Sequence, residues 1–276
     1  MNYDKTKKLC QHIFVYMSIG LILLLFLVPL SYVFITALKT PMDFLREPLS
    51  FKFSPTFENF KIAWEEASLG TYLFNSIFYT VVATVVSLLC SLLLAYPIAR
   101  EYIPFAKKLY TFLLLGMFLP NGAIMLFRML VGVGLYNTRL GYIMSLITIG
   151  GFPTMFLTAQ IKAIPKELDE AAVIDGCGYF RYFFSVIIPL AKPAIATTAM
   201  LVAIPIWNNI SKAVMYLSDN RLYPVARGVY SFAGAYTTDW TSMSAAVVIV
   251  SMPLLILYLL LQRYIVTGLS AGSVKS

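Results

Sequence analysis

The chain has 276 residues, of which 59% are hydrophobic and only 12% are charged, and its formal net charge is +8. Soluble domains carry about 25% charged residues, so this composition excludes an ordinary soluble protein and leaves room for several membrane spans of about 20 residues each. The basic residues are scattered and form no dense run, which excludes a nucleic-acid-binding protein.

Six charge-poor apolar runs follow one another along the chain. They are Ile13–Leu38, Tyr72–Ala95, Leu109–Leu135, Leu140–Ile161, Ala194–Leu217 and Met243–Leu261. Continuous apolar runs indicate spanning helices, because the strands of a membrane barrel alternate apolar and polar residues. The first run has no small-residue cleavage site close behind it, so we interpret it as a retained anchor and not as a signal peptide. The sequence therefore predicts an all-α polytopic membrane protein with six transmembrane helices.

The Lys and Arg residues of the connections predict the orientation. They are more numerous at the N-terminus, in the connection with Arg100, Lys107 and Lys108, in residues 161–193 and in the tail than in the opposite connections. Cytoplasmic connections carry an excess of these residues, so both termini are predicted to be cytoplasmic. The expected layout is a cytoplasmic N-terminus (1–12), a first transmembrane helix (13–38), an extracytoplasmic loop (39–71), a transmembrane core (72–262) that includes a cytoplasmic loop (162–190), and a cytoplasmic tail (263–276).

The extracytoplasmic loop contains an amphipathic segment at residues 57–66, and we expect it to be a short helix. Thr56 is the expected N-cap, because its hydroxyl can accept a hydrogen bond from a free backbone N–H of the first turn. Such a helix either lies on the protein's own membrane surface or forms a platform for an extracytoplasmic partner. The sequence leaves both interpretations open.

Four of the later runs contain residues that interrupt helices. These are Leu119–Gly122, Gly150–Pro153, Pro205–Asn209 and Pro253. A proline frees a carbonyl group one turn earlier, and at membrane depth that carbonyl needs a neighbouring donor or water. We therefore expect breaks at these positions, either as packing kinks or as helices that line a polar cavity.

Several classes of function lack the residues that they need. The six runs contain no Asp or Glu in their interiors, which argues against a proton- or sodium-coupled carrier. The chain has no P-loop and no Ser/His/Asp or Cys/His set. Its three cysteines have no paired spacing, and its only histidine, His12, begins the first run and has no metal-binding partners. We therefore expect no catalytic, cofactor or metal site, and the energy for any driven transport must come from a separate subunit.

The 162–190 loop is the most informative part of the sequence. Pro165 suits the first position of a helix, and the acidic residues that follow it favour the positive end of the helix dipole. Gly176 fits the left-handed stop after such a helix. On the first helix, Leu168, Ala171 and Ala172 share a face that another backbone can approach closely.

A second helix should begin at Tyr179 and end at Pro189. Arg181 and Ser185 mark its solvent side. Its predicted apolar underside consists of Tyr179, Phe180, Phe183, Phe184, Val186, Ile187 and Ile188.

These residues also resemble a known signature. Glu170-Ala171-Ala172, then Asp175-Gly176, then Ile188-Pro189-Leu190 resemble the EAA motif of the inner-membrane permease subunits of ABC importers. Other segments are similar to the carbohydrate-uptake branch of that family, in particular to the second permease of maltose-type importers: Asn75-Ser76, Ala95–Arg100, Leu119-Pro120, Leu135–Thr138, Trp207-Asn208 and Gly268–Lys275. The chain departs from the family pattern at Cys177-Gly178, where Ala-Ser is usual, and at Ser276, where glycine is favoured.

The resemblance implies a type I ABC importer permease fold, a bacterial cytoplasmic (inner) membrane location and import of a sugar or oligosaccharide by alternating access. The implied partners are a second permease in a heterodimer, two cytoplasmic ATPase subunits that bind ATP and Mg, and an extracytoplasmic solute-binding protein. The implied ATPase-coupling residues are Glu170, Ala171, Ala172, Asp175 and Gly176, with the tail as a secondary contact.

Aromatic stacking and amide hydrogen bonds are suited to holding a sugar, so candidates for the translocation pathway can be named. They are Asn121, Tyr136, Trp207, Asn208 and Asn209. In maltose-type systems the partner permease can hold the sugar, in which case these residues line only a conduit. Two other classes of function remain as alternatives: a stand-alone channel or ion-coupled secondary transporter, and a membrane scaffold without transport.

Overall fold

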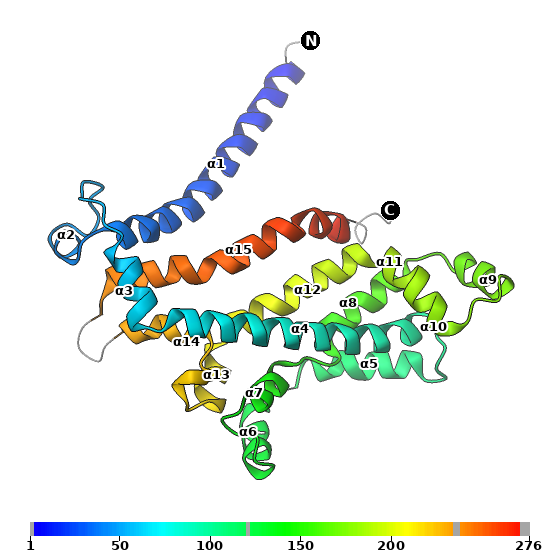
Figure 1. The fold of residues 1–276 in the computed structure, drawn as a ribbon. Coiled ribbons are helices and arrows are strands. Elements are labelled where there is room, and N and C mark those ends of the chain that lie inside the picture. The colour runs from blue at the N-terminus through cyan, green and yellow to red at the C-terminus, as the bar shows by residue number, and fades with distance from the viewer. Residues whose placement is uncertain (1–2, 120–121, 234–237, 271–276) are drawn as a thin grey trace. The chain divides into compact units, whose positions relative to one another are not determined.

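The structure is a computed structural model that describes residues 3–119, 122–233 and 238–270 (Figure 1). These residues form helices throughout, and no strand occurs among them apart from an isolated bridge between Ala233 and Thr238. The helices are α1 (Tyr3–Leu38), α2 (Pro41–Arg46), α3 (Glu58–Glu66), α4 (Leu69–Ala99), α5 (Ala106–Gly116), α6 (Ala123–Gly132), α7 (Arg139–Leu146), α8 (Gly151–Lys162), α9 (Glu167–Ile174), α10 (Tyr179–Tyr182), a π-helical turn η1 (Phe183–Ile187), α11 (Ile188–Leu190), α12 (Lys192–Trp207), α13 (Ile210–Tyr216), η2 (Asn220–Leu222), α14 (Val225–Val229), η3 (Tyr230–Phe232) and α15 (Trp240–Ser270).

Three helical segments are long and apolar enough to cross a bilayer: Gln11–Leu38 of α1, all of α4, and Trp240–Arg263 of α15. Two bent helix pairs bring the number to five if each pair is one span. They are α7 with α8, bent by 52°, and Tyr179–Leu190 with α12, bent by 76°. The predicted all-α membrane fold is therefore confirmed, whereas the described residues do not reach the predicted count of six.

The third predicted run, Leu109–Leu135, is not one continuous helix. It is divided between α5 and α6, and the chain leaves α5 through a turn after Gly116. Pro120 and Asn121, which the sequence marks as breaking residues, lie outside the described residues. Each of the two helices is shorter than the roughly 20 residues that a span requires.

The other predicted breaks have different outcomes. α7 and α8 are separated at Gly150, whose φ of +76° is a conformation that glycine adopts without strain. α12 ends at Trp207 and α13 begins at Ile210, as the Pro205–Asn209 segment predicts. At Pro253 α15 continues, so the helix is not interrupted there, and a packing kink at this position stays a prediction. A proline removes only one backbone hydrogen bond, and in an apolar environment a helix keeps all its other bonds by continuing.

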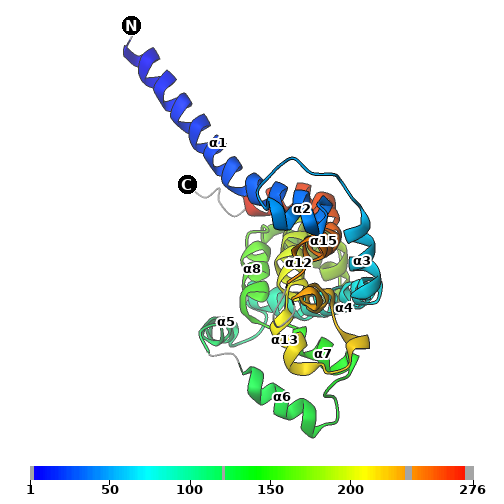
Figure 2. The same cartoon turned by 90° about the vertical axis from the view of Figure 1, so that its left-hand side faces the viewer.

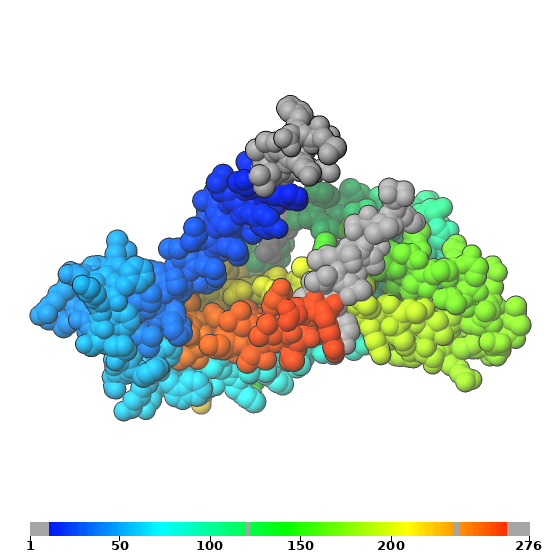
Figure 3. Space-filling model, turned by 90° about the horizontal axis from the view of Figure 1, so that it is seen from above, coloured from blue at the N-terminus to red at the C-terminus, as the bar shows by residue number. Residues whose placement is uncertain are grey.

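The structure divides into two compact units, which we describe separately. Unit 1 comprises Met1–Leu69 and Val229–Ser251, and unit 2 comprises Gly70–Gly228 and Met252–Ser276. Within unit 1, the apolar side chains along α1 are exposed over most of its length from residue 13 onward (Figure 3). A helix that is apolar on all sides is suited to a lipid environment.

In unit 1, α3 is held against the end of α1 by a buried amide. The Asn59 side chain donates to the carbonyl oxygens of Ala37 at 2.8 Å and Lys39 at 2.7 Å. The predicted cap of this helix is displaced by one residue: Phe57 occupies the N-cap position, while the Thr56 hydroxyl accepts from the Glu58 N–H at 3.2 Å. The α3 helix is thus a fixed part of the extracytoplasmic loop that the sequence predicts.

Among the described residues of unit 2, buried apolar side chains form a first and a second core cluster. The first lies around α4, α7, α12 and α13, where the Tyr79 and Tyr142 rings meet edge to face at 4.9 Å and α7 packs beside α13 (Figure 2). Lys212, a charged residue inside the predicted fifth run, is half-buried there and donates to the backbone carbonyl of Ser145. The second cluster joins the ends of α4 and α8 to the 162–190 loop.

Candidate functional site

The first helix of the 162–190 loop, α9, is short, acidic at its start and exposed. It begins at Glu167 with Lys166 as N-cap, so the predicted start at Pro165 is two residues early. Lys166 has no side-chain cap and already has helical φ and ψ angles, and Pro165 precedes it as a connector. Glu167, Asp169 and Glu170 occupy the first turn as predicted and complement the helix dipole. No residue of α9 is buried.

The stop of α9 is confirmed in detail. Asp175 is the C-cap, and Gly176 follows with φ of +68°. The N–H of Cys177 donates to the Ala172 carbonyl at 2.8 Å, and the N–H of Gly176 donates to the Val173 carbonyl at 3.1 Å. This pair of bonds is the Schellman motif, which satisfies the last carbonyls of the helix and fixes its end. The unusual Cys177-Gly178 pair leaves this turn intact.

The exposed surface of α9 combines acidic, small and bulky apolar side chains. Glu170, Ala171 and Asp175 are exposed, whereas Ala172 is half-buried and packs against the second core cluster. Val173 and Ile174 are 75% and 85% exposed. Sequence reasoning did not single out these two residues. Exposed apolar side chains rimmed by charge are typical of a docking surface, so we include Val173 and Ile174 in it.

The underside of the second helix differs from the prediction. Tyr182, Phe183 and Ile187 are buried, but Phe180 and Phe184 are 68% and 58% exposed, so their assignment to the underside is wrong. An α-helix advances about 100° per residue, so Phe180 and Phe184 lie to one side of the stripe that Tyr182, Phe183 and Ile187 form, and the predicted underside was too broad. A π-helical turn, η1, begins at Phe183, and in it the N–H of Ile188 bonds to the Phe183 carbonyl five residues earlier. The predicted solvent side, Arg181 and Ser185, is confirmed.

The second helix ends at Leu190, one residue after the predicted stop at Pro189, and a bend of 76° separates it from α12. A proline in an α-helix crowds the carbonyl four residues earlier, and here that residue, Ser185, lies in the wider π turn. We infer that the π turn accommodates Pro189 without a break.

A buried ion pair joins α9 to the end of α4. Arg100 Nε lies 2.9 Å from Asp169 Oδ2, and the two side chains are only 1% and 17% exposed. Arg100 Nη1 also donates to the Ile164 carbonyl at 2.9 Å, and the Tyr182 hydroxyl donates to Asp169 Oδ1. These three side chains, which we call the Arg100 link, connect α4, α9 and α10. Sequence analysis treated Asp169 only as a helix-start acid and did not consider Tyr182.

Aromatic side chains pack next to the Arg100 link. The Tyr96 ring, one turn before Arg100, lies 5.1 Å from the ring of Phe183 and 5.1 Å from that of Tyr179. Leu157 and Ile161 of α8 belong to the same fully buried cluster. Interiors packed in this way are stiff and have low compressibility. Figure 1 shows α9 at one extremity of unit 2, beyond α10 and α11. The exposed helix is therefore attached to the spans through a rigid base.

The predicted pathway residues are distributed differently. Asn121 and the tail residues 271–276 lie outside the described residues. Asn208 is the C-cap of α12, and the Asn209 side chain caps α13 by accepting from the Lys212 N–H at 3.0 Å. Trp207 is buried and its Nε1–H has no hydrogen-bond partner, while Tyr136 meets Phe127 edge to face at 5.3 Å. The amides thus have structural uses, and a pathway role for these residues stays a prediction.

Within the described part of the chain, no group of three or more His, Cys, Asp or Glu side chains is placed to hold a metal ion. Cys90 and Cys177 are free thiols. The 162–190 loop offers an exposed surface of acidic, small and apolar side chains.

The fold is that of a membrane protein in which an exposed, capped helix stands on a packed base. The family described as "Binding-protein-dependent transport system inner membrane component" matches residues 87–271, which include the whole 162–190 loop. The match covers more than half of the chain, so the chain belongs to this family.

Known permeases are similar to this chain over most of its length. The chain is 32% identical over 253 residues to the melibiose/raffinose/stachyose import permease protein MelC of Bacillus subtilis (strain 168), covering 90% of this chain and 91% of that one. It is 31% identical over 254 residues to the diacetylchitobiose uptake system permease protein NgcG of Streptomyces coelicolor, covering 90% and 84%. A solved bacterial ABC transporter involved in the import of the polysaccharide alginate matches with a TM-score of 0.81 at 25% identity, over 94% of this chain and 98% of that one.

These comparisons confirm the predicted class. The chain is a membrane-spanning permease subunit of an ABC importer, and ATP hydrolysis belongs to a separate subunit. The resemblance to the EAA-containing permeases is likewise confirmed. The alternatives of a stand-alone channel, a secondary transporter and a scaffold are not supported.

Proposed function

We propose that this subunit imports a sugar or oligosaccharide by alternating access, as one half of a permease heterodimer in the bacterial cytoplasmic membrane. The curated relatives named above import or take up oligosaccharides, and the family description names dependence on a binding protein. The further partners would be an extracytoplasmic solute-binding protein and two cytoplasmic ATPase subunits that hold ATP and Mg. Both termini would then be cytoplasmic, with the layout expected from the basic residues.

The proposed coupling surface is α9, with Glu170, Ala171, Ala172, Asp175 and Gly176 as its docking residues. The observation that carries this proposal is that most of α9 is exposed, while its base is fixed by the buried Arg100 link. A partner that moves α9 therefore also moves the end of α4. A flexible loop in the same place would absorb such a movement.

The energy requirement favours a separate motor. To move a gate from 1:99 to 99:1, ligands must discriminate between its two states by about 5.5 kcal/mol. A weakly held sugar in transit is poorly suited to supply this difference. Closure of two ATP-binding subunits, transmitted through α9, could supply it. The candidates for the sugar conduit remain Asn121, Tyr136, Trp207, Asn208 and Asn209.

Reconstitution tests the proposed function. The subunit, its partner permease and the ATPase pair are placed in liposomes, with the solute-binding protein outside. We expect uptake of labelled oligosaccharide that requires ATP inside the liposomes and the binding protein outside, and ATP hydrolysis that rises when both sugar and binding protein are present. Sugar flux through this chain alone, without an ATPase, would refute the proposal and favour a channel or carrier.

A further inference from the structure

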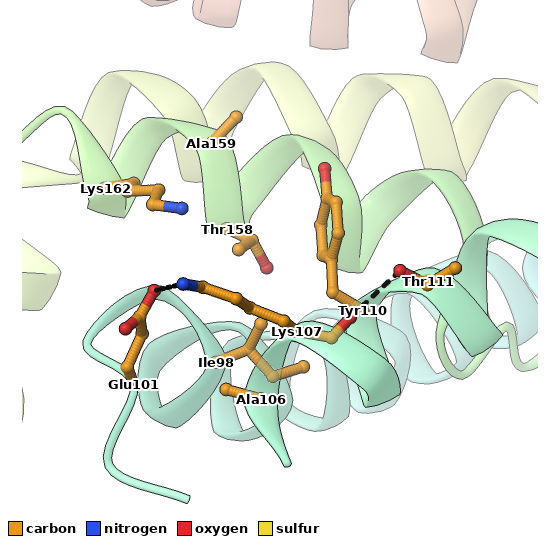
Figure 4. Close-up of a pocket in the computed structure, with 9 residues that line it drawn as sticks. All are labelled: Ile98, Glu101, Ala106, Lys107, Tyr110, Thr111, Thr158, Ala159 and Lys162. Carbon is orange, nitrogen blue, oxygen red and sulfur yellow. Dashed lines mark hydrogen bonds and ion pairs between the residues drawn. The ribbon is translucent and has the colours of Figure 1, made fainter. Parts of the chain in front are cut away.

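A cavity of about 400 Å³ lies between the end of α4, the start of α5 and the end of α8 in unit 2 (Figure 4). Its walls carry polar groups: Lys107, Tyr110 and Thr111 from α5, Thr158 and Lys162 from α8, and Glu101 from the connection after α4. This cavity is separate from the exposed surface of α9, and the proposed transport function makes no use of it.

The charges in the cavity are mainly positive. Lys107 and Lys162 approach it from two different helices, and their amino groups lie on facing walls (Figure 4). One carboxylate, Glu101, lies 3.7 Å from Lys107, and both of these side chains are exposed to solvent. A third lysine, Lys108, lines the two adjoining hollows. Within the cavity one carboxylate faces two ammonium groups, and Lys108 adds a positive charge beside it, so the cavity favours an anionic ligand.

The cavity continues along α5 into an apolar groove. Lys107 and Thr111 line both spaces, and the second is completed by Lys108, Phe112 and Leu115. Phe112 and Leu115 are 70% and 62% exposed. Within about two turns of α5, the surface thus changes from ammonium groups to hydroxyl groups and then to exposed apolar side chains. A ligand that matches it has a negative head and an apolar tail.

We propose that this cavity binds the phosphate headgroup of an anionic phospholipid, with one acyl chain in the groove beside Phe112 and Leu115. Lys107 and Lys162 would contact the phosphate, Lys108 would lie beside it, and Tyr110 offers a hydroxyl donor. Basic pockets between membrane helices on the cytoplasmic side are suited to anionic headgroups. The apolar groove decides between the two sources of a phosphate group, because a free phosphate ion would gain nothing from it.

Native mass spectrometry of the delipidated importer complex in detergent tests this proposal. Phosphatidylglycerol and phosphatidylethanolamine with identical acyl chains are added in turn, and bound lipid is counted. Wild type should retain phosphatidylglycerol preferentially. The Lys107→Gln/Lys162→Gln variant should bind it about tenfold to thirtyfold more weakly, since each lysine near an anionic headgroup contributes roughly a fivefold factor.

Matched variants separate a specific site from general charge and from misfolding. Lys52→Gln/Lys192→Gln removes two exposed lysines outside the cavity and should bind phosphatidylglycerol like the wild type. Lys107→Arg/Lys162→Arg keeps both charges and should also bind it. Equal retention by the wild type and the Lys107→Gln/Lys162→Gln variant would overturn the proposal, as would displacement of the lipid by inorganic phosphate.

The inference rests on the proposed orientation only for the choice of leaflet. The measurement counts bound lipid and requires neither sugar nor ATP turnover. A complex that binds phosphatidylglycerol at these lysines but imports no sugar would support the lipid site and contradict the transport proposal. The two proposals can therefore fail separately.

Discussion

Sugar uptake should fall by more than about tenfold when Glu170→Lys and Ala171→Trp are combined in this subunit. Both residues are exposed on α9, so the change alters the docking surface without disturbing the core. Reversal of a charge inside a protein interface costs about 2–5 kcal/mol, and every 1.4 kcal/mol is a factor of ten in affinity. The measurement is uptake of labelled oligosaccharide by cells that depend on this importer, with the amount of subunit in the membrane determined in parallel.

A matched variant on the same helix controls this experiment. Glu167→Lys reverses an exposed charge on the same helix outside the EAA motif and should leave most uptake intact. Ala172→Trp is unsuitable as a docking variant, because Ala172 packs against the buried cluster and a large side chain there would disturb the loop itself. If the Glu170→Lys/Ala171→Trp variant is present in the membrane in normal amount and takes up sugar normally, the proposed docking role of α9 in transport is contradicted.

The second large effect is expected at the Arg100 link. Asp169→Asn removes the charge that compensates Arg100, whose side chain is 1% exposed. Loss of one partner of a buried ion pair costs about 3–5 kcal/mol, because the remaining charge stays buried without compensation. We expect the thermal midpoint of the purified complex to drop clearly, and uptake to fall in parallel. The midpoint is measured from the amount of intact complex that gel filtration recovers after heating. Arg100→Gln together with Asp169→Asn should recover much of the thermal midpoint, since no unpaired charge remains.

An exposed ion pair in the same unit provides the comparison. Arg221 Nη2 lies 2.8 Å from Asp219 Oδ2, with the arginine side chain 88% exposed. Hydrogen bonds from Arg221 hold the pKa of the Asp219 carboxyl below its ordinary value. Solvent screens such pairs, so Asp219→Asn should leave the thermal midpoint nearly unchanged. If Asp169→Asn behaved like Asp219→Asn, the Arg100 link would not be a structural connection.

Local signals in the sequence predicted the parts of the structure that local chemistry determines. Gly176 was identified as the stop of α9 because a left-handed residue after a helix favours glycine, and the Schellman bonds confirm it. The long apolar runs predicted α1, α4 and α15 because length and hydropathy alone decide whether a helix can span a bilayer.

Other features depend on partners far away in the chain and were missed. The pairing of Arg100 with Asp169 joins residues on two different helices, and no spacing rule indicates it. Phe180 and Phe184 are exposed although the predicted apolar underside included them, and the π-helical turn at Phe183–Ile187 was not predicted. Val173 and Ile174 were not predicted to be surface residues, because apolar side chains are usually buried. In α9 no residue is buried, and both side chains are exposed.

The central claim is that α9 contacts an ATPase subunit while the importer works, and site-directed cross-linking tests it most directly. Cysteine is placed at Ala171 in a background with Cys10, Cys90 and Cys177 replaced, and at Ser185 as an exposed control on the second helix of the loop. We predict that a short reagent with one thiol-reactive end and one photoreactive end links position 171 to the co-expressed ATPase. The yield should change when ATP is added, and position 185 should link far less. A transport-competent complex in which position 171 links to no other polypeptide would contradict the claim.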